Sequence, residues 1–253
     1  MLPTPLRAFS DNYIWTLADD GQRMLVVDPG DAAPVLAASR DGVEPAAILL
    51  THHHDDHVGG VPALLDRWPG LAVFGPADER IPFPVREVGD GDRVEVAGWS
   101  FDVIAVAGHT VSHVAFHGHG LLFCGDTLFS LGCGRLFEGT PAQMLAALDR
   151  LSALPPETLV CCGHEYTLSN AAFARTVDPG NPALMRRCED VTAMHQSGRP
   201  TLPVALASEL DCNPFLRIDA PAVRAAVTAH AGADTGRVER FAALRRWKDG
   251  FRA

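Results

Sequence analysis

The chain has 253 residues, of which 47% are hydrophobic, so it can bury a substantial core as one large domain or as one domain with a smaller appendage. Its formal net charge of −10 disfavours a nucleic-acid partner, because phosphates would be repelled unless a local basic patch prevailed. No apolar stretch approaches the ~20 residues that cross a bilayer, and residues 1–7 lack a secretory signal pattern, so we expect no membrane contact and a cytoplasmic location.

The first part of the chain is rich in strand patterns. Residues 12–17 and 24–28 are apolar runs on either side of a turn at 19–21, which predicts a β-hairpin. The Ala-rich segment 34–39 has helical composition, with a proline tolerated in its first turn. Residues 46–50 then form the short apolar run that is typical of a fully buried strand.

Directly after this strand the sequence reads THHHDDH, before an expected helix at 58–65. A tight strand-to-helix connection turns alternate side chains toward one point, so His52 and His54 can chelate one ion while Asp56 and His57 reach a second. Imidazole and carboxylate ligands suit zinc, iron or manganese, whereas a thiolate-rich set would have indicated a closed structural zinc site. The alternative is a solvated polar loop whose histidines bind metal opportunistically.

Further histidines and an aspartate follow three later strand-like segments, 101–106, 121–123 and 158–162. The residues concerned are His109, Asp126 and His164. Any one of them alone would more often be a hydrogen-bonded histidine or a turn aspartate. Four strand ends that deliver His or Asp together predict a metal-binding site.

Two other histidines near these ligands have different expected roles. His113 lies four residues after His109 on a segment that reads as a strand, residues 112–117, so we expect it to brace the site by hydrogen bonding rather than to bind metal. By the alternation of side chains, His53 points away from the ligand face, and we expect it to be exposed.

The remaining elements complete an α/β pattern. A strand at 93–96 and a helix at 142–151 precede a change of character after Tyr166, where strand-like runs vanish. Helices are expected beyond that point at 184–196, 222–229 and 237–248, separated by Pro/Gly breakers. Mixed sheets with helices outside are the natural packing of such a series.

The six cysteines show no C-x-x-C pair, so neither a zinc ribbon nor a redox dithiol is expected. Cys161 and Cys162 are neighbours within a strand-like run, where cysteine ordinarily serves as a small buried residue. We therefore expect reduced cysteines and no catalytic thiol.

Taken together, these motifs resemble the metallo-β-lactamase superfamily and, within it, the glyoxalase II branch, the hydroxyacylglutathione hydrolases. The H-x-H-x-D-H motif carries the superfamily resemblance, and the segments 132–140, 162–167 and 245–249 carry that to the branch. The resemblance covers nearly the whole chain. It implies a four-layer αββα sandwich in residues 1–165 and a smaller α-helical C-terminal domain, residues 166–253, that contributes to the glutathione-binding site.

The resemblance also implies two divalent metal ions per chain, zinc as the first choice and iron or manganese as alternatives. The implied ligands are His52, His54 and His109 for one metal, Asp56, His57 and His164 for the other, and Asp126 as the bridge between them. A metal-bridging hydroxide would hydrolyse S-D-lactoylglutathione to D-lactate and glutathione, the second step of methylglyoxal degradation. Asp56 would also orient this hydroxide, with ligation alone as the alternative.

Glutathione carries two carboxylates, which guanidinium and ammonium groups recognise. The substrate contacts that the resemblance implies are Arg135, Phe137, Tyr166, Arg245 and Lys248. Arg135 and Phe137 stand where the animal enzymes carry Lys and Tyr, so the charge is kept and a phenolic hydroxyl is missing. From the sequence alone, Arg245 and Lys248 would be a solvated charged helix end.

Three rival functions remain open from the sequence. An iron-dependent persulfide dioxygenase of the same superfamily shares the Gly-Cys-Gly-Arg segment but lacks the second-metal position and the long helical tail. A non-catalytic scaffold would have lost ligands, and all seven ligand positions are present here. A thioesterase or lactonase with another small-molecule substrate is the third. We expect a monomer.

Overall fold

The computed structural model describes residues 2–19, 22–39, 42–232 and 236–252. By Cα proximity the chain divides into two compact units: unit 1 comprises Met1–Ala105, Ser112–Gly125 and Cys161–His164, and unit 2 comprises Val106–Val111, Asp126–Val160 and Glu165–Ala253. Among the described residues, no helix combines the length and the apolar character needed to cross a bilayer.

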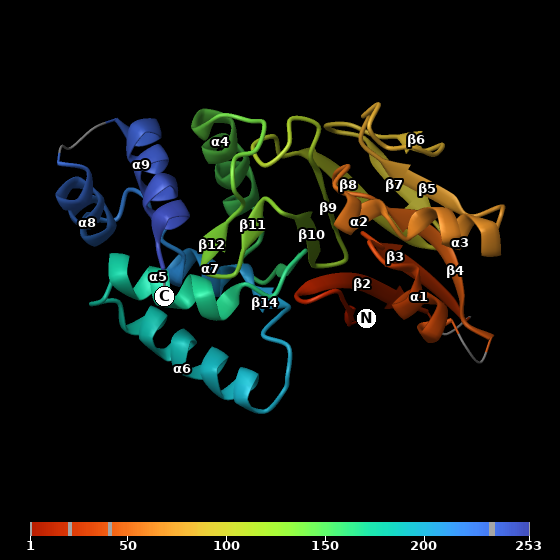
Figure 1. Ribbon diagram of the computed structural model, residues 1–253, viewed down its shortest axis with the longest axis horizontal. Helices are drawn as coiled ribbons and strands as arrows, with labels where there is room; N and C mark the ends of the chain where they lie inside the picture. The colour runs from red at the N-terminus through yellow and green to blue at the C-terminus, as the bar shows by residue number, and fades with distance from the viewer. Residues whose placement is uncertain (1, 20–21, 40–41, 233–235, 253) are drawn as a thin grey trace. The chain divides into compact units, whose positions relative to one another are not determined.

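The first sheet of unit 1 has six strands in the order β1-β2-β3-β4-β5-β6 (Figure 1). Their bounds are Thr4–Ala8, Asn12–Ala18, Arg23–Val27, Glu44–Leu49, Ala72–Gly75 and Arg86–Glu87. Strands β2 and β3 pair antiparallel, with Trp15 opposite Val27, which confirms the predicted hairpin. Its expected turn includes Asp20 and Gly21, which lie outside the described residues. Strand β4 is parallel to both neighbours, in keeping with its nearly continuous apolar sequence.

Three short helices accompany this sheet: α1 (Ala32–Ala38), α2 (Asp55–Val58) and α3 (Val61–Arg67). The helix predicted over 58–65 corresponds to α3, but it begins three residues later than predicted, at Val61. A Cβ atom at Gly60 would lie 2.6 Å from the carbonyl oxygen of Pro29, to which the Gly60 N–H donates. Helix α3 therefore begins only after Gly60, because the backbone that follows β3 lies against this glycine.

The second sheet has the order β14-β13-β10-β9-β8-β7. Four of its strands belong to unit 1 and pair antiparallel: β7 (Arg93–Val96), β8 (Trp99–Ala105), β9 (Val114–Gly118) and β10 (Leu121–Gly125). Large apolar side chains such as Phe101, Phe116 and Phe123 are fully buried on them. The predicted strands at 93–96, 101–106, 112–117 and 121–123 are thus confirmed, with small shifts in their bounds.

Strand β13 (Leu159–Cys162) pairs with β14 (Val204–Ala205). The expectation that strands vanish after Tyr166 is therefore wrong. Two residues are too few to produce a periodic pattern, and Val204 is recognised as a strand residue only through its partner Val160.

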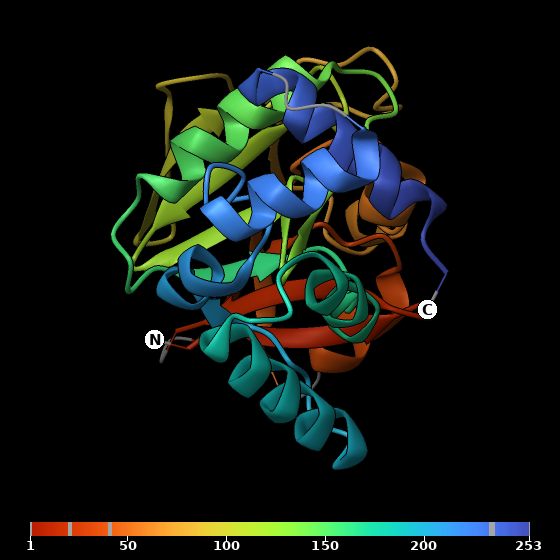
Figure 2. The same cartoon turned by 90° about the vertical axis from the view of Figure 1, so that its left-hand side faces the viewer.

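Unit 2 is mainly helical. Its elements are α4 (Pro141–Ser152), α5 (Thr167–Val177), α6 (Pro182–Gln196), α7 (Leu206–Cys212), α8 (Pro221–Ala231), α9 (Arg237–Gly250) and the hairpin β11 (Leu128–Phe129) with β12 (Gly132–Cys133). Helix α9 packs against both α4 and α8 (Figure 2). The predicted helices correspond to α4, α6, α8 and α9, whereas α5 and α7 were not predicted.

Candidate functional site

Asp28, at the end of β3, organises the histidine-rich loop of unit 1. Its carboxylate accepts hydrogen bonds from the Thr51 N–H at 2.8 Å, from Thr51 Oγ1 at 2.7 Å and from His57 Nδ1 at 3.0 Å. The ring of His57 is therefore protonated on Nδ1, which puts its lone pair on Nε2. Histidine ligands of metals are usually oriented by a carboxylate in this way.

His164, at the end of β13, is oriented by a second carboxylate. Its Nδ1 donates to Asp11 Oδ1 at 2.8 Å, so its lone pair also lies on Nε2. The Nε2 atoms of His164 and His57 lie 3.4 and 3.7 Å from one oxygen, Oδ2 of Asp56. Asn12 Nδ2 donates to that same oxygen at 3.0 Å.

The arrangement of these three groups fits a divalent metal ion. Ligand atoms of Asp56, His57 and His164 lie within 4.8 Å of one another. Two imidazole lone pairs that face a carboxylate oxygen repel it, and a cation among them turns this repulsion into attraction. Nitrogen and oxygen donors in this number are those that zinc, iron and manganese accept.

His52 and His54 lie on the same loop. Thr51 Oγ1 donates to Asp28, so it accepts from His52 Nδ1 at 3.0 Å, and this leaves the lone pair of His52 on Nε2. That Nε2 lies 3.1 Å from His54 Nδ1. The His113 ring stacks on the His52 ring with centroids 4.6 Å apart, and its Nδ1 donates to the carbonyl oxygen of Val114 at 3.1 Å, so the hydrogen-bonded brace expected of it stays a prediction.

The structure corrects the expectation for His53. Its side chain is only 11% exposed, and its Nδ1 lies 3.4 Å from Asp78 Oδ2. Hydrogen bonds from Arg80 lower the pKa of Asp78 far below its usual range, so the Asp78 carboxylate is negatively charged at neutral pH. Side-chain alternation does turn His53 away from its neighbours, but toward this carboxylate rather than toward solvent.

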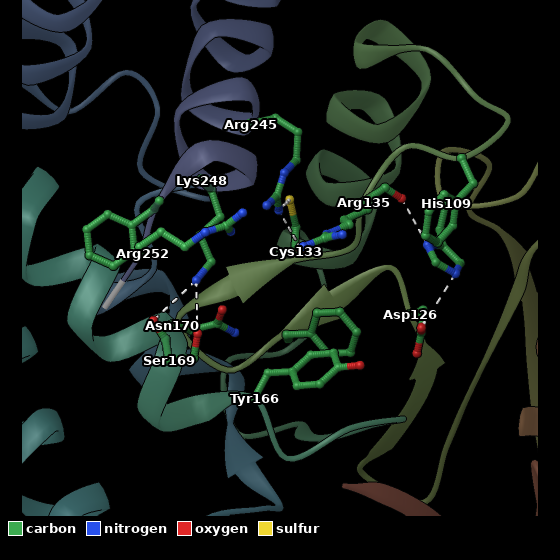
Figure 3. Close-up of a pocket in the computed structure, with 13 residues that line it drawn as sticks. His109, Asp126, Cys133, Arg135, Tyr166, Ser169, Asn170, Arg245, Lys248 and Arg252 are labelled. Carbon is green, nitrogen blue, oxygen red and sulfur yellow. Dashed lines mark hydrogen bonds and ion pairs between the residues drawn. The ribbon is translucent and has the colours of Figure 1, made fainter. Parts of the chain in front are cut away.

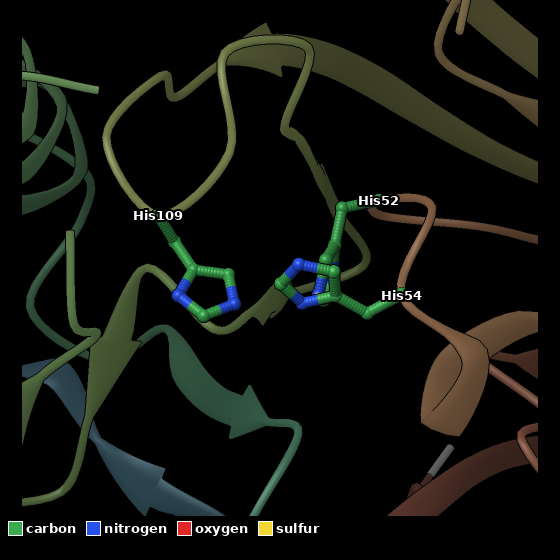
Figure 4. A group of neighbouring side chains, drawn as sticks. All are labelled: His52, His54 and His109. Carbon is green, nitrogen blue, oxygen red and sulfur yellow. The ribbon is translucent and has the colours of Figure 1, made fainter. Parts of the chain in front are cut away.

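His109 and Asp126 are the predicted ligands in unit 2. His109 Nδ1 donates to the carbonyl oxygen of Arg135 at 2.9 Å, and its Nε2 lies 3.5 Å from Asp126 Oδ2. A Cβ atom at Gly134 would lie 1.8 Å from the carbonyl oxygen of Asp126, so only glycine fits there. In Figure 4, His109 projects from the loop after β8, and His52 and His54 project from the loop after β4.

A cavity of about 490 Å³ in unit 2 adjoins His109 and Asp126 (Figure 3). It is lined by all five predicted substrate-contact residues, Arg135, Phe137, Tyr166, Arg245 and Lys248. The lining residues that sequence reasoning missed are Phe129, Cys133, Ser169, Asn170, Phe251 and Arg252. The lining of the cavity thus contains the cations Arg135, Arg245 and Lys248 together with two candidate metal ligands.

Lys248 is partly withdrawn from water in this cavity. Burial, together with the nearby positive charges of Arg245 and Arg135, lowers the pKa of Lys248 to about 8. Its ammonium donates to the carbonyl oxygen of Ser169 at 3.2 Å and lies 5.4 Å from the centre of the Phe173 ring. A carboxylate bound beside it would favour its charged form.

Arg245 is held more firmly than Lys248. It is 4% exposed, and its Nη1 donates to the carbonyl oxygen of Cys133 at 2.7 Å. Its Nε donates to Asp249 Oδ1 at 3.1 Å. Burial raises the pKa of the Cys133 thiol to about 11, so this thiol stays neutral, in keeping with the prediction of no catalytic cysteine.

Phe137 and Tyr166 are the more exposed aromatic residues of the lining. The Phe137 ring is 64% exposed and meets the His109 ring edge-on, with centroids 5.1 Å apart. The Phe137 N–H donates to the carbonyl oxygen of His109 at 3.3 Å. The Tyr166 ring packs against Phe129 with centroids 5.2 Å apart.

Comparison of the sequence with known proteins identifies a family. A family model described as the metallo-beta-lactamase superfamily matches residues 12–164, and one described as the hydroxyacylglutathione hydrolase C-terminus matches residues 165–251. A hydroxyacylglutathione hydrolase from Stenotrophomonas maltophilia (strain R551-3) is 59% identical over 251 residues, 99% of each chain. One from Xanthomonas campestris pv. campestris (strain B100) is 60% identical over 252 residues, also 99% of each.

Solved structures share the fold. ETHE1 from Myxococcus xanthus aligns with a TM-score of 0.68 and 25% identity, over 99% of this chain and 91% of that one. TTHA1623, in a di-iron-bound form, aligns with a TM-score of 0.61 and 29% identity, over 85% of this chain and all of that one. These likenesses confirm the predicted α/β sandwich, and the chain belongs to the hydroxyacylglutathione hydrolases of the metallo-beta-lactamase superfamily.

Proposed function

We propose that this protein is a thiolester hydrolase that converts S-(2-hydroxyacyl)glutathione, with S-D-lactoylglutathione as its main substrate, into a 2-hydroxy acid and glutathione. The observation that carries the proposal is the cavity of unit 2, in which Arg135, Arg245 and Lys248 lie beside His109 and Asp126. Three cations suit the two carboxylates of glutathione. The hydroxyacylglutathione hydrolases that are about 60% identical over the whole chain support the same substrate.

We assign two divalent metal ions to the site, zinc in the first place, with iron or manganese as alternatives. The ligands would be His52, His54 and His109 for one ion, Asp56, His57 and His164 for the other, and Asp126 for both. The di-iron-bound form of TTHA1623 supports the count of two. When bound, such a pair supplies Lewis acidity and lowers the pKa of a water molecule from ~15.7 toward ~7.

The residues of the chain bind and orient the reactants. Arg135 and Lys248 pair with the glutathione carboxylates, and the Tyr166 hydroxyl donates to the glutathione backbone. The Asp56 side chain is 43% exposed, so it can reach the attacking water and orient it. The attacking water gives up one proton as its oxygen adds to the thioester carbonyl carbon, the C–S bond breaks, and glutathione leaves as a thiolate that takes up a proton. The acid product releases its remaining proton to solvent.

The setting of the protein belongs to the same proposal. Residues 166–253 would form a helical domain that completes the glutathione-binding site of a catalytic domain spanning 1–165. We place the protein in the cytoplasm as a monomer with a small-molecule substrate. All six cysteines are free thiols, as is usual in a reducing compartment.

The test of this function is steady-state hydrolysis of S-D-lactoylglutathione, followed by the loss of thioester absorbance, with metal content measured on the same samples. We expect turnover at close to two metals per chain, loss of turnover on chelation and its return when zinc is added back. Two bound metals without turnover would mean a different substrate. One bound iron without turnover would point to the persulfide dioxygenase instead.

Asp11 offers a separate check on the second metal site. Replacing it by alanine removes the acceptor that fixes the ring of His164, and we expect metal affinity at that site to fall about 10–100-fold. Titration of the metal-free protein against a competing chelator measures this. Asp66→Ala, at an exposed position on α3, should leave the affinity unchanged. Equal affinities for the Asp11 variant and the wild type would contradict the orienting role.

A further inference from the structure

We infer that Glu209, a buried carboxylate on α7, is a positioning residue for the substrate cavity. It fixes the turn of the β11–β12 hairpin, and strand β12 of this hairpin accepts a hydrogen bond from Arg245. The inference rests on the proposed function, since it concerns how the glutathione-binding cations are kept in place. Glu209 does not line the cavity and acts through the hairpin.

Glu209 is fully buried and gathers donors from the hairpin turn. Its Oε1 accepts from Ser130 Oγ at 2.7 Å, and its Oε2 accepts from the Leu131 N–H at 2.7 Å. Oε2 also accepts from Asn213 Nδ2 at 3.0 Å. A carboxylate taken out of water is costly unless several donors meet it, and burial raises the pKa of Glu209 in spite of these bonds. Because burying this carboxylate costs free energy, its place beside the turn indicates that the protein needs the turn in one conformation.

The turn is one that the local sequence would not adopt unaided. Leu131 has φ +59°, in the left-handed region that is unfavourable for a branched side chain. The Glu209 carboxylate receives the N–H of this same residue. Asn213 strengthens the hold, because its Nδ2 also donates to the carbonyl oxygens of Phe129 at 3.1 Å and Gly132 at 2.9 Å. Both strands are thus tied to α7 and the residue that follows it.

The fixed hairpin leads directly to the cavity. Cys133, the last residue of β12, accepts from Arg245 Nη1 through its carbonyl oxygen, and both residues line the cavity. Two residues later, the carbonyl oxygen of Arg135 accepts from His109. Figure 3 shows Cys133 between Arg135 and Arg245. A displaced turn would therefore move Arg135 and Arg245, two of the three cations that line the cavity.

The experiment compares Glu209→Gln with the wild-type holoenzyme. Glutamine has the same shape but turns an amide donor toward one of the hairpin donors. The dissociation constant of glutathione is measured by calorimetry. Kinetic constants are measured with S-D-lactoylglutathione and with S-lactoyl-N-acetylcysteamine, a thioester that lacks both carboxylates. Val35→Ala is the control for general destabilisation, because it removes buried side-chain atoms from α1 in the core of unit 1, a helix that carries neither Glu209 nor a residue of the hairpin.

We expect Glu209→Gln to raise the dissociation constant of glutathione and KM for its thioester about tenfold, the effect of one lost hydrogen bond to a charged group. The kcat/KM for the carboxylate-free thioester should stay within about twofold. Val35→Ala should lower Tm and leave the glutathione dissociation constant and both kinetic comparisons unchanged. Equal losses with the two thioesters, or unchanged glutathione binding in folded Glu209→Gln, would overturn the inference.

Two further outcomes are informative. If Glu209→Gln does not fold, Ser130→Ala removes a single donor and should raise the glutathione dissociation constant about threefold, and no change there would overturn the inference. If the wild type binds glutathione but hydrolyses no glutathione thioester, the proposed function fails while the calorimetric comparison still decides the role of Glu209. A wild type that binds no glutathione overturns both.

Discussion

Replacing Asp56 by alanine is expected to lower kcat for S-D-lactoylglutathione at least about a thousand-fold. The carboxylate lies within 4 Å of the Nε2 atoms of His57 and His164, so its loss removes a proposed metal ligand, which is also the group proposed to orient the attacking water. Because the proposed reaction depends on a water whose pKa is lowered by ~9 units, loss of that activation is costly. Steady-state kinetics and metal content on the same sample measure the effect.

The neighbouring residue provides the control for this substitution. Asp55 carries the same charge one position earlier, begins α2 and is exposed, so Asp55→Ala should keep kcat within about threefold of the wild type. An Asp56 variant with wild-type turnover, or an Asp55 variant with an equal loss, would contradict the assignment of Asp56.

The second large effect is a rise of KM at alkaline pH, caused by deprotonation of Lys248. Its pKa is lowered to about 8 in the protein without substrate, so the ammonium is charged below pH 8 and becomes neutral as the pH rises above it. Only the charged form pairs with a glutathione carboxylate. We therefore expect KM for S-D-lactoylglutathione to be flat below pH 8 and to climb between pH 8 and 9.5, with kcat changing little.

Two variants separate Lys248 from other ionising groups. Lys248→Arg keeps its charge throughout this range, because guanidinium does not deprotonate, and it should abolish the climb of KM. Lys248→Ala should raise KM about tenfold or more at pH 7 and also abolish the climb. If Lys248→Arg shows the same alkaline rise as the wild type, another group is responsible for it.

The sequence was sufficient where the chemistry lies in one short stretch. His52, His54, Asp56 and His57 fall within six residues, so their spacing alone predicted a metal site after a buried strand. The helix predicted over 58–65 begins only at Val61, because Gly60 lies against the carbonyl oxygen of Pro29, a residue distant in sequence. A hydropathy pattern carries no information about such a close approach of two backbone segments.

The supporting residues could not be predicted for the same reason. Asp11 contacts a histidine 153 positions away, and Glu209 contacts Ser130 across 79 positions. Neither has a sequence neighbourhood that distinguishes it from an ordinary surface acid. The substrate-contact residues were found through resemblance to a family rather than through any local pattern, and Arg245 in particular is an unremarkable helix residue until Cys133 is placed beside it.

The bonds between the start of unit 1 and β13 bear on how the protein is made. The Tyr13 N–H donates to the carbonyl oxygen of Gly163, and Asp11 orients His164, so the second set of proposed ligands is complete only when residues 11–13 meet residues 161–164. A nascent chain on the ribosome carries the histidine-rich loop for more than a hundred residues before this closure is possible. Long-range pairing of this kind slows folding, and the proposed second metal site can form only after residues 161–164 have been synthesised.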